Sequence, residues 1–188
     1  MSLLLNKHKC VFGLAGFSNS GKTTLSISLI KIFRQKGFSV GSIKHAHHDF
    51  EIDKPGKDSW RHREAGSQEV IVSSSKRIAH MIEHEKYNDV ELNELLLLQK
   101  RKDIILVEGF KKNYLPKLEV RREAEKKELL SLKDKNIFAI ATDDTKNINL
   151  KDTQTIILDL NSPDKIVEFL IQHFNLKKNN NINRQKNE

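Results

Sequence analysis

A glycine-rich segment near the N-terminus constrains the fold more than any other part of the chain. Residues 16–23, GFSNSGKT, fit the pattern G-x-x-x-x-G-K-[ST] at every fixed position. An apolar run, residues 10–15, precedes the segment, and residues 22–36 follow it with apolar side chains at helical spacing. A strand, a glycine-rich turn and a helix in this order aim backbone N–H groups and a helix N-terminus at one spot, where they attract phosphate. The segment therefore predicts a phosphate-binding loop.

Each position of this loop has an expected task. The glycines Gly16 and Gly21 let the backbone curl around phosphate groups. Lys22 should reach the β- and γ-phosphates of a nucleoside triphosphate, and the hydroxyl of Thr23 should bind Mg²⁺. Thr24 is placed to contact the α-phosphate. The other residues that we expect to line the phosphates are Ser18, Asn19 and Ser20.

Apolar runs and helical segments alternate along the rest of the chain. We expect strands at 10–15, 38–44, 69–74, 77–82, 104–108, 118–120, 137–142 and 155–160, and helices at 22–36, 58–65, 91–101 and from the Ser162-Pro163 cap onward. This alternation predicts a three-layer α/β fold, the P-loop NTPase fold, with a largely parallel sheet and helices on both faces. We expect one nucleotide-binding domain, residues 1–176, and a disordered polar tail, residues 177–188.

Two carboxylates follow predicted strands. Glu108 ends the strand at 104–108, and Asp49 lies just beyond the strand at 38–44. Because the carboxyl ends of parallel strands share one edge of a sheet, both are candidate Mg²⁺ ligands beside Thr23. Both are also candidate catalytic residues together with Lys22. Asp49 would act as a general base, and Glu108 would act through a metal-bound water or orient the attacking water.

The polar stretch after the second strand leaves two interpretations open. His45, His47 and His48 are residues that Zn or Ni prefers, yet no Cys or Glu at ligand spacing accompanies them. A loop that packs around phosphates, with one histidine bonded to it, is the alternative. Further along, Asp58 is the expected N-cap of a short helix. Arg61 on that helix could clamp a phosphate or carboxylate, or simply lie in a solvated loop.

Composition excludes several classes of protein. The net charge of +8 favours anionic partners without choosing among them, and no nucleic-acid motif or aromatic interleaving is present. The N-terminal apolar run, residues 3–5, is shorter than a signal peptide or a membrane span requires. We therefore expect a cytoplasmic protein that binds neither nucleic acid nor membrane. The single cysteine, Cys10, is expected to be an inert thiol in the core.

Four blocks of sequence together resemble one family. They are GFSNSGKTT (16–24), KHAHHDFEIDKPGKDS (44–59), REAGS (63–67) and DIILVEGFK (103–111). These blocks look like those of the molybdopterin-guanine dinucleotide biosynthesis protein B family, MobB. The similarity runs from about Cys10 to near Phe174. The HHDFEIDKPGKDS and VEGFK stretches are far more specific to this family than the phosphate loop, which a large superfamily shares.

The resemblance implies a GTP-binding accessory protein with slow GTP hydrolysis. Such proteins form homodimers and assist the guanylyltransferase that joins GMP to molybdopterin, which gives the guanine dinucleotide form of the molybdenum cofactor. The implied ligands and partners are GTP, Mg²⁺, molybdopterin or its guanine dinucleotide, and that guanylyltransferase. The resemblance assigns the phosphate and Mg²⁺ contacts to Gly16, Gly21, Lys22, Thr23 and Thr24. Asp49 and Glu108 match acidic positions of the family, and Asp58 and Arg61 lie in its signature loop.

Base specificity and oligomeric state rest on weaker patterns. No N-K-x-D motif for reading guanine occurs. Asp143 follows the strand at 137–142 and could accept the guanine N1–H and N2–H₂ groups, although a plain turn explains it equally well. The segment 68–82 is the candidate for pairing with a second copy. Two alternative functions stay open, namely a small-molecule kinase with Asp49 as base and a nickel or zinc metallochaperone GTPase.

Overall fold

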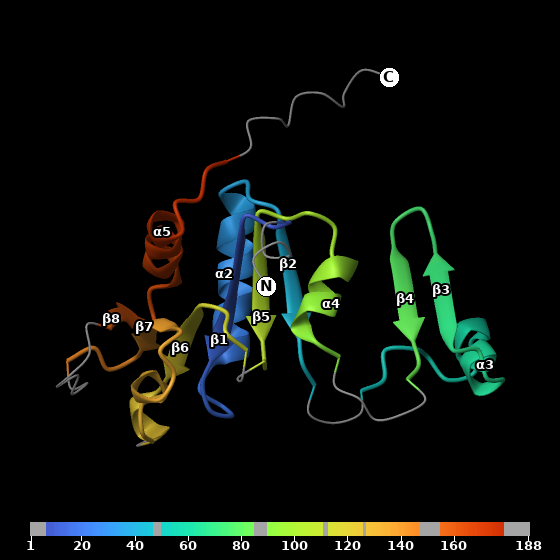
Figure 1. Ribbon diagram of the computed structural model, residues 1–188, viewed down its shortest axis with the longest axis horizontal. Helices are drawn as coiled ribbons and strands as arrows, with labels where there is room; N and C mark the ends of the chain where they lie inside the picture. The colour runs from blue at the N-terminus through green and yellow to red at the C-terminus, as the bar shows by residue number, and fades with distance from the viewer. Residues whose placement is uncertain are drawn as a thin grey trace. The chain divides into compact units, whose positions relative to one another are not determined.

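Six strands form the main sheet in the order β2-β5-β1-β6-β7-β8 (Figure 1). All neighbouring pairs in this sheet are parallel. The strands are β1 (Cys10–Ala15), β2 (Val40–Lys44), β5 (Ile104–Glu108), β6 (Lys117–Arg121), β7 (Ile137–Thr142) and β8 (Ile156–Asp159). Because β1 lies between β5 and β6, the residues that follow these three strands meet at one edge of the sheet.

The computed structural model describes residues 7–46, 50–84, 90–110, 113–125, 127–146 and 155–178. The chain divides into two compact units. One is built from the residues up to His45 together with those from Leu92 onward, and the other from residues 46–91. Of the tail expected to be disordered, residues 179–188 lie outside the described residues. Within the described ranges, no helix combines the length and apolar character that crossing a membrane requires.

Helices cover both faces of the main sheet, as the sequence predicts. They are α2 (Lys22–Gln35), α4 (Leu92–Leu98) and α5 (Pro163–His173), and two short 3₁₀ helices are η1 (Glu123–Glu125) and η2 (Leu130–Leu132). Successive residues of a strand point to opposite faces. Phe12 of β1 packs with Leu29 of α2 and Leu170 of α5 in the larger core cluster. Its neighbour Val11 packs with Leu96 of α4 in a smaller cluster on the other face.

The unit formed by residues 46–91 contains α3 (Asp58–Glu64), β3 (Glu69–Ser73) and β4 (Ile78–Ile82). The strands β3 and β4 pair antiparallel in a sheet of their own, with Ile71 opposite His80. The reason is the connection, residues 74–77, which is too short for the crossover that a parallel pair needs. The amide of Ser74 donates to the carbonyl of Arg77 over 2.8 Å and closes that turn.

Several expected helix bounds differ from the observed ones by one to three residues. Lys57, with an extended backbone (φ −79°, ψ 163°), is the N-cap of α3, and Asp58 is the first helical residue instead. An aspartate there still favours the helix because its charge opposes the positive end of the helix dipole. The helix expected at 91–101 ends at Leu98. The next residue, Gln99, donates from its side-chain amide to the carbonyl of Ser42 over 3.2 Å, as the chain turns toward β5.

Candidate functional site

The glycine-rich loop between β1 and α2 begins with a residue that only glycine suits. Gly16 has φ 152°, and a Cβ atom built on it would lie 2.4 Å from the carbonyl oxygen of Val120 and 2.6 Å from Oγ of Ser20. The backbone of β6 and the far end of the loop therefore both press against Gly16. This close approach explains the first fixed glycine of the pattern and fixes the curvature of the loop.

The end of the loop uses left-handed backbone conformations. Asn19 has φ 67° and Gly21 has φ 96°, with the fully buried Ser20 between them. Asparagine tolerates this region better than most residues, and glycine adopts it freely. Left-handed residues in a tight turn can direct successive backbone N–H groups into one concavity, which suits an anion. The predicted loop thus has a backbone suited to phosphate.

Lys22 reaches back over this loop. Its Nζ atom donates to the carbonyl of Phe17 over 2.5 Å and to that of Gly16 over 3.1 Å. The side chain is half-buried, and its ammonium lies at the carbonyls of the first two loop residues. A cation in this place can exchange carbonyl oxygens for phosphate oxygens, which are stronger acceptors because they are charged.

Thr23, the first-turn residue after Lys22, meets the carboxylate at the end of β5. Its Oγ1 atom donates a hydrogen bond to Oε1 of Glu108 over 3.3 Å. The parallel register of β1 and β5 pairs Leu14 with Glu108 and brings the carboxylate level with the start of the loop. A hydroxyl and a carboxylate side by side are the hard oxygen donors that Mg²⁺ takes. These residues therefore fit the expected metal, while Asp49 lies outside the described residues.

The residues after β2 and β5 lie against each other. Gly109 has φ 113°, and a Cβ atom built on it would lie 2.7 Å from Cβ of His45. The amide of His45 donates to the carbonyl of Glu108 over 2.8 Å, and its ring centroid lies 4.9 Å from that of Phe110. Among the described residues, no three or more His, Cys, Asp or Glu side chains gather as a metal site. His47 and His48, two of the candidate Zn or Ni ligands, lie outside the described residues.

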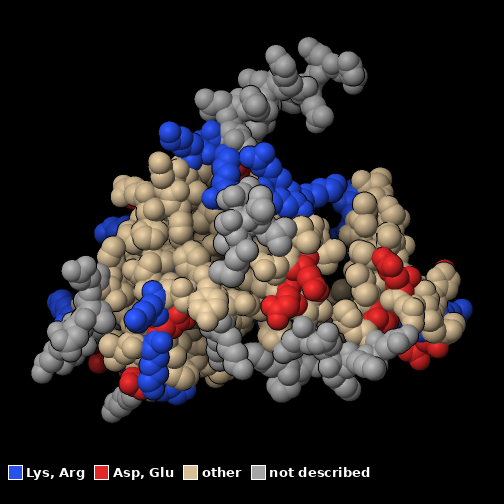
Figure 2. Space-filling model, in the orientation of Figure 1, with Lys and Arg blue, Asp and Glu red and all other residues tan. Residues whose placement is uncertain are grey.

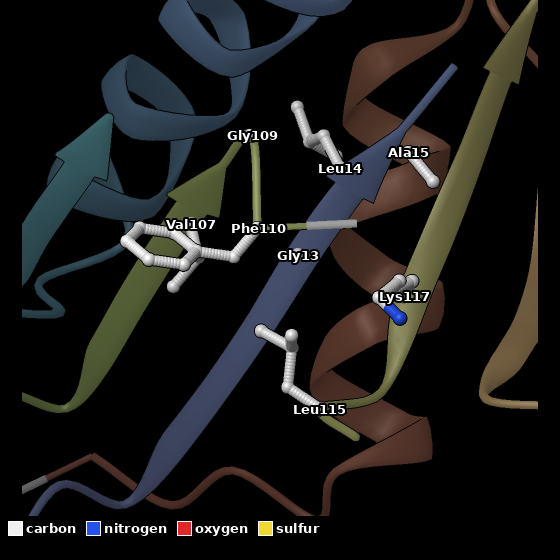
Figure 3. A pocket seen from close by; sticks show the side chains of 8 residues that line it. All are labelled: Gly13, Leu14, Ala15, Val107, Gly109, Phe110, Leu115 and Lys117. Carbon is white, nitrogen blue, oxygen red and sulfur yellow. The ribbon is translucent and has the colours of Figure 1, made fainter. Parts of the chain in front are cut away.

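A small cavity lies at β1 next to this edge. Figure 3 shows Phe110, Leu115 and Lys117 around Gly13, where the strand carries no side chain. The cavity measures about 10 Å³, which is room for about one water molecule and not for a nucleoside. Lys117 is buried there and donates to Oδ2 of Asp134 over 2.7 Å, so it serves the packing of the sheet.

Asp143 follows β7 at the same edge and already accepts two hydrogen bonds. Its Oδ1 atom accepts from the amide of Glu123 over 2.8 Å, and Oδ2 accepts from Nη1 of Arg122 over 3.2 Å. Arg122 is a residue that the sequence interpretation missed. Its signal was its place two residues after the strand expected at 118–120, at the edge where the phosphate loop was expected.

The remaining predicted site residues are spread over both units. Thr24 lies exposed in the first turn of α2, and Asp58 and Arg61 belong to α3 in the unit of residues 46–91. Another arginine of α3, Arg63, forms ion pairs with two glutamates of the same unit. It donates to Glu51 over 2.9 Å and 3.2 Å in a two-pronged pair, and it lies 2.8 Å from Glu83. Of the predicted site residues, the structure brings Gly16, Lys22, Thr23 and Glu108 together around the loop.

The parallel sheet, the loop after β1 and the Thr23–Glu108 contact define an α/β protein of the P-loop nucleotide-binding class. Comparison with known proteins narrows this class. The chain belongs to the MobB family, molybdopterin guanine dinucleotide synthesis protein B, whose profile matches residues 11–143. This finding confirms the resemblance that the four sequence blocks indicated.

Individual relatives support the same assignment. The chain is 36% identical over 175 residues to the molybdopterin-guanine dinucleotide biosynthesis adapter protein of Haemophilus influenzae, which covers 92% of this chain and 95% of that protein. It is 34% identical over 166 residues to the protein of the same name from Escherichia coli, covering 86% and 91% respectively. The structure of Bacillus subtilis MobB superimposes with a TM-score of 0.65 at 25% identity and covers 91% of this chain and 99% of that one.

Proposed function

We propose that this chain binds GTP with Mg²⁺ at the phosphate loop. On this proposal it serves, in the cytoplasm, as the adapter for making the guanine dinucleotide form of the molybdenum cofactor. The hydrogen bond between Thr23 and Glu108 carries the nucleotide part of the proposal. It joins the hydroxyl expected to bind Mg²⁺ to the carboxylate expected to hold the same ion or its water. Membership of the MobB family carries the pathway.

The proposed contacts follow from the loop. The amides of residues 18–21, the ammonium of Lys22 and the hydroxyl of Thr24 would hold the phosphates. Thr23 and Glu108 would hold Mg²⁺, with Asp49 as a further proposed ligand. The ion would offset the charge of the terminal phosphates and orient them. Arg61 stays a candidate for a second anionic group of the cofactor, since a guanidinium can bind phosphate with two parallel hydrogen bonds. Asp58 stays a candidate for accepting hydrogen bonds from N–H or O–H groups of the same ligand.

Recognition of guanine is assigned to Asp143. Each carboxylate oxygen has two acceptor positions, so its bonds to Arg122 and Glu123 leave room for the N1–H and N2–H₂ donors of guanine. The Asp143→Asn variant tests this assignment, because an amide can donate to the 2-oxo group of xanthine. We expect the variant to lose affinity for GTP and gain affinity for xanthosine triphosphate. If its preference between these nucleotides equals that of the wild type, another group reads the base.

The partners proposed are molybdopterin or its guanine dinucleotide, and the guanylyltransferase that forms it. The Haemophilus influenzae and Escherichia coli relatives are named as adapter proteins of this biosynthesis. An adapter needs to signal whether nucleotide is bound more than it needs rapid turnover. Slow GTP hydrolysis, with Glu108 and Asp49 as the candidate residues beside Lys22, is therefore part of the proposal.

A homodimer is proposed through the β3–β4 hairpin. One face of this hairpin carries Ile71, Ile78 and Ile82, and all three are exposed, with 62%, 67% and 46% of their surface accessible. The opposite face carries Val70, which is buried. Apolar side chains gathered on one exposed face are typical of a surface that another protein covers. Light scattering of Ile71→Lys should show a monomer where the wild type shows a dimer, and a monomeric wild type would refute the dimer.

A deletion strain tests the proposed function as a whole. In such a strain, we expect low activity of molybdoenzymes that use the guanine dinucleotide form and normal activity of those that use unmodified molybdopterin. The wild-type gene should restore the activity, and Lys22→Ala should not. Ser28→Ala, which removes a half-buried hydroxyl that donates to the carbonyl of Thr24 in the same helix, is the matched control and should restore it. Full activity in the deletion strain would refute the assignment to this pathway.

A further inference from the structure

The segment after β6 contacts the phosphate loop at two places. A Cβ atom built on Gly21 would lie 3.5 Å from Nε and 3.5 Å from Nη2 of Arg122. The guanidinium therefore stands where a side chain at position 21 would extend. Nζ of Lys127 lies 4.5 Å from the centroid of the Phe17 ring, within the range of a cation–π contact. Two cations from one segment thus border the loop. Figure 2 shows basic and acidic side chains on the surface near the short helices that follow β6, at the lower left of the view.

The guanidinium of Arg122 is hydrogen-bonded to Asp143 through Nη1. Its Nη1 atom donates to Oδ2 of Asp143, and the same carboxylate accepts from the amide of Glu123, the next residue. Asp143 thus fixes both the side chain and the backbone of this segment. Within the described part of the chain, the edge formed by Nε and Nη2 is the one that faces Gly21. This edge carries two parallel N–H donors, the arrangement that matches two oxygens of a phosphate.

The order of the sheet separates this cation from the metal ligands. β1 has β5 on one side and β6 on the other, so Glu108 and Arg122 approach the loop from opposite sides. A triphosphate with its metal-bound end beside Thr23 and Glu108 has its other phosphates further along the loop. In this binding mode, those phosphates would lie next to the amide of Gly21 and the edge of Arg122 that faces it.

We infer that Arg122 binds the α- and β-phosphates of the nucleotide through Nε and Nη2, while Asp143 holds Nη1 and positions the group. This inference rests on the proposed nucleotide site and adds a basic residue to it. The side chains of Arg122 and Asp143 are 44% and 26% exposed, so the pair is open to a ligand and contributes little to the stability of the fold. Because GDP and GTP share these two phosphates, Arg122 acts on both nucleotides alike. Lys22 differs, since it also reaches the γ-phosphate.

Calorimetric titration with GDP and with GTP, both with Mg²⁺, tests this role. Arg122→Ala should weaken both nucleotides by a similar factor, roughly tenfold or more, as expected for lost hydrogen bonds to a charged group. Arg122→Lys should recover only part of the affinity, because an ammonium lacks the planar fork. The matched control is Arg101→Ala, which removes the same charge from an exposed residue before β5, at the opposite edge of the sheet. It should bind as the wild type does.

The outcomes distinguish a wrong role for Arg122 from a wrong nucleotide site. If Arg122→Ala binds both nucleotides as tightly as Arg101→Ala does, while Lys22→Ala binds GTP weakly, the role of Arg122 is wrong and the nucleotide site stands. A loss confined to GTP, or full affinity in Arg122→Lys, would also overturn the two-pronged contact to shared phosphates. If the wild type binds neither nucleotide, the proposed function itself fails. Melting curves of each variant confirm that the folded protein is compared.

Discussion

The hydroxyl of Thr23 and the carboxylate of Glu108 are 85 residues apart in the chain and joined by a hydrogen bond of 3.3 Å. Neither residue alone defines a metal site. Together they bring a neutral and a charged oxygen to the mouth of the phosphate loop, because β1 and β5 run parallel and in register at this point. The contact ties the loop to a second strand of the sheet.

The first prediction concerns this pair. In the wild type, Mg²⁺ should strengthen the binding of GTP, and in Thr23→Ala this gain should fall by roughly tenfold, or about 1.4 kcal/mol. Glu108→Gln should lower it as well, because the amide removes a negative charge from the ion. Titrations with and without Mg²⁺ measure the gain, and Ser28→Ala on the same helix is the control. An unchanged gain in both site variants would mean that the ion binds elsewhere.

A second prediction concerns the first glycine of the loop. Gly16→Ala should lower the free energy of unfolding by about 2–4 kcal/mol, because the new Cβ would lie 2.4 Å from the carbonyl oxygen of Val120 and φ is 152°. Gly37→Ala is the matched control. Its φ is 87° and no atom lies within 4 Å of the added Cβ, so only backbone strain of about 1 kcal/mol applies. Equal losses in urea unfolding would show that the close approach of β6 to the loop is not the constraint.

Acid stability gives a third prediction, away from the site. Burial alone raises the pKa of Asp103, but hydrogen bonds from Lys9 and from the hydroxyl and amide of Ser39 outweigh it and leave the pKa below 3.8. The folded pKa is therefore lower than the unfolded one. The stabilisation is complete above pH 3.8 and disappears as the pH falls through the lower, folded value.

Asp103→Asn should therefore lower the free energy of unfolding by about 2 kcal/mol at pH 7. The gap to the wild type should close in the acid range below the ordinary pKa. Glu128→Gln, which removes a charge from an exposed ion pair with Lys133, should change stability by less than about 1 kcal/mol. Denaturant unfolding at several pH values checks this, and a gap that stays constant with pH would contradict the argument.

The single thiol supplies a fourth prediction. Cys10 is buried, and burial raises its pKa to about 12 from an ordinary 9.0. Since the thiolate is the reactive form, a disulfide reagent at pH 8 should modify the folded protein at least roughly a thousandfold more slowly than the unfolded protein. Absorbance of the released thiol measures both rates. Fast modification of the folded chain would mean that the amino-terminal edge of β1 opens readily.

Sequence patterns within short segments predicted the phosphate loop and the residues expected beside it. The glycine spacing, the apolar strand at 10–15 and the carboxylate after residues 104–107 each depend on neighbours in the chain. The structure places Lys22 at the loop carbonyls and Thr23 beside Glu108, and their roles toward a nucleotide stay predictions. The family blocks likewise depend on contiguous residues. Predictions from such features do not depend on knowing which strands are adjacent in the sheet.

Sequence patterns did not predict the contacts between segments that are distant in the chain. The pairing of Arg122 with Asp143 exists because β6 and β7 are neighbours in the sheet, and no spacing along the chain encodes that order. The same holds for Asp103, which fastens the start of β5 to Ser39 beside β2. The hairpin of β3 and β4 was expected as two strands, but the sequence did not show that they form a sheet of their own.

The most direct measurement is a calorimetric titration of the wild type and Lys22→Ala with GTP, GDP and ATP in the presence of Mg²⁺. The wild type should bind GTP more tightly than ATP. Lys22→Ala should weaken GTP much more than GDP, because the ammonium that now lies at the carbonyls of Gly16 and Phe17 reaches the terminal phosphates. Equal losses for GTP and GDP, or equal affinity of the wild type for GTP and ATP, would contradict the account.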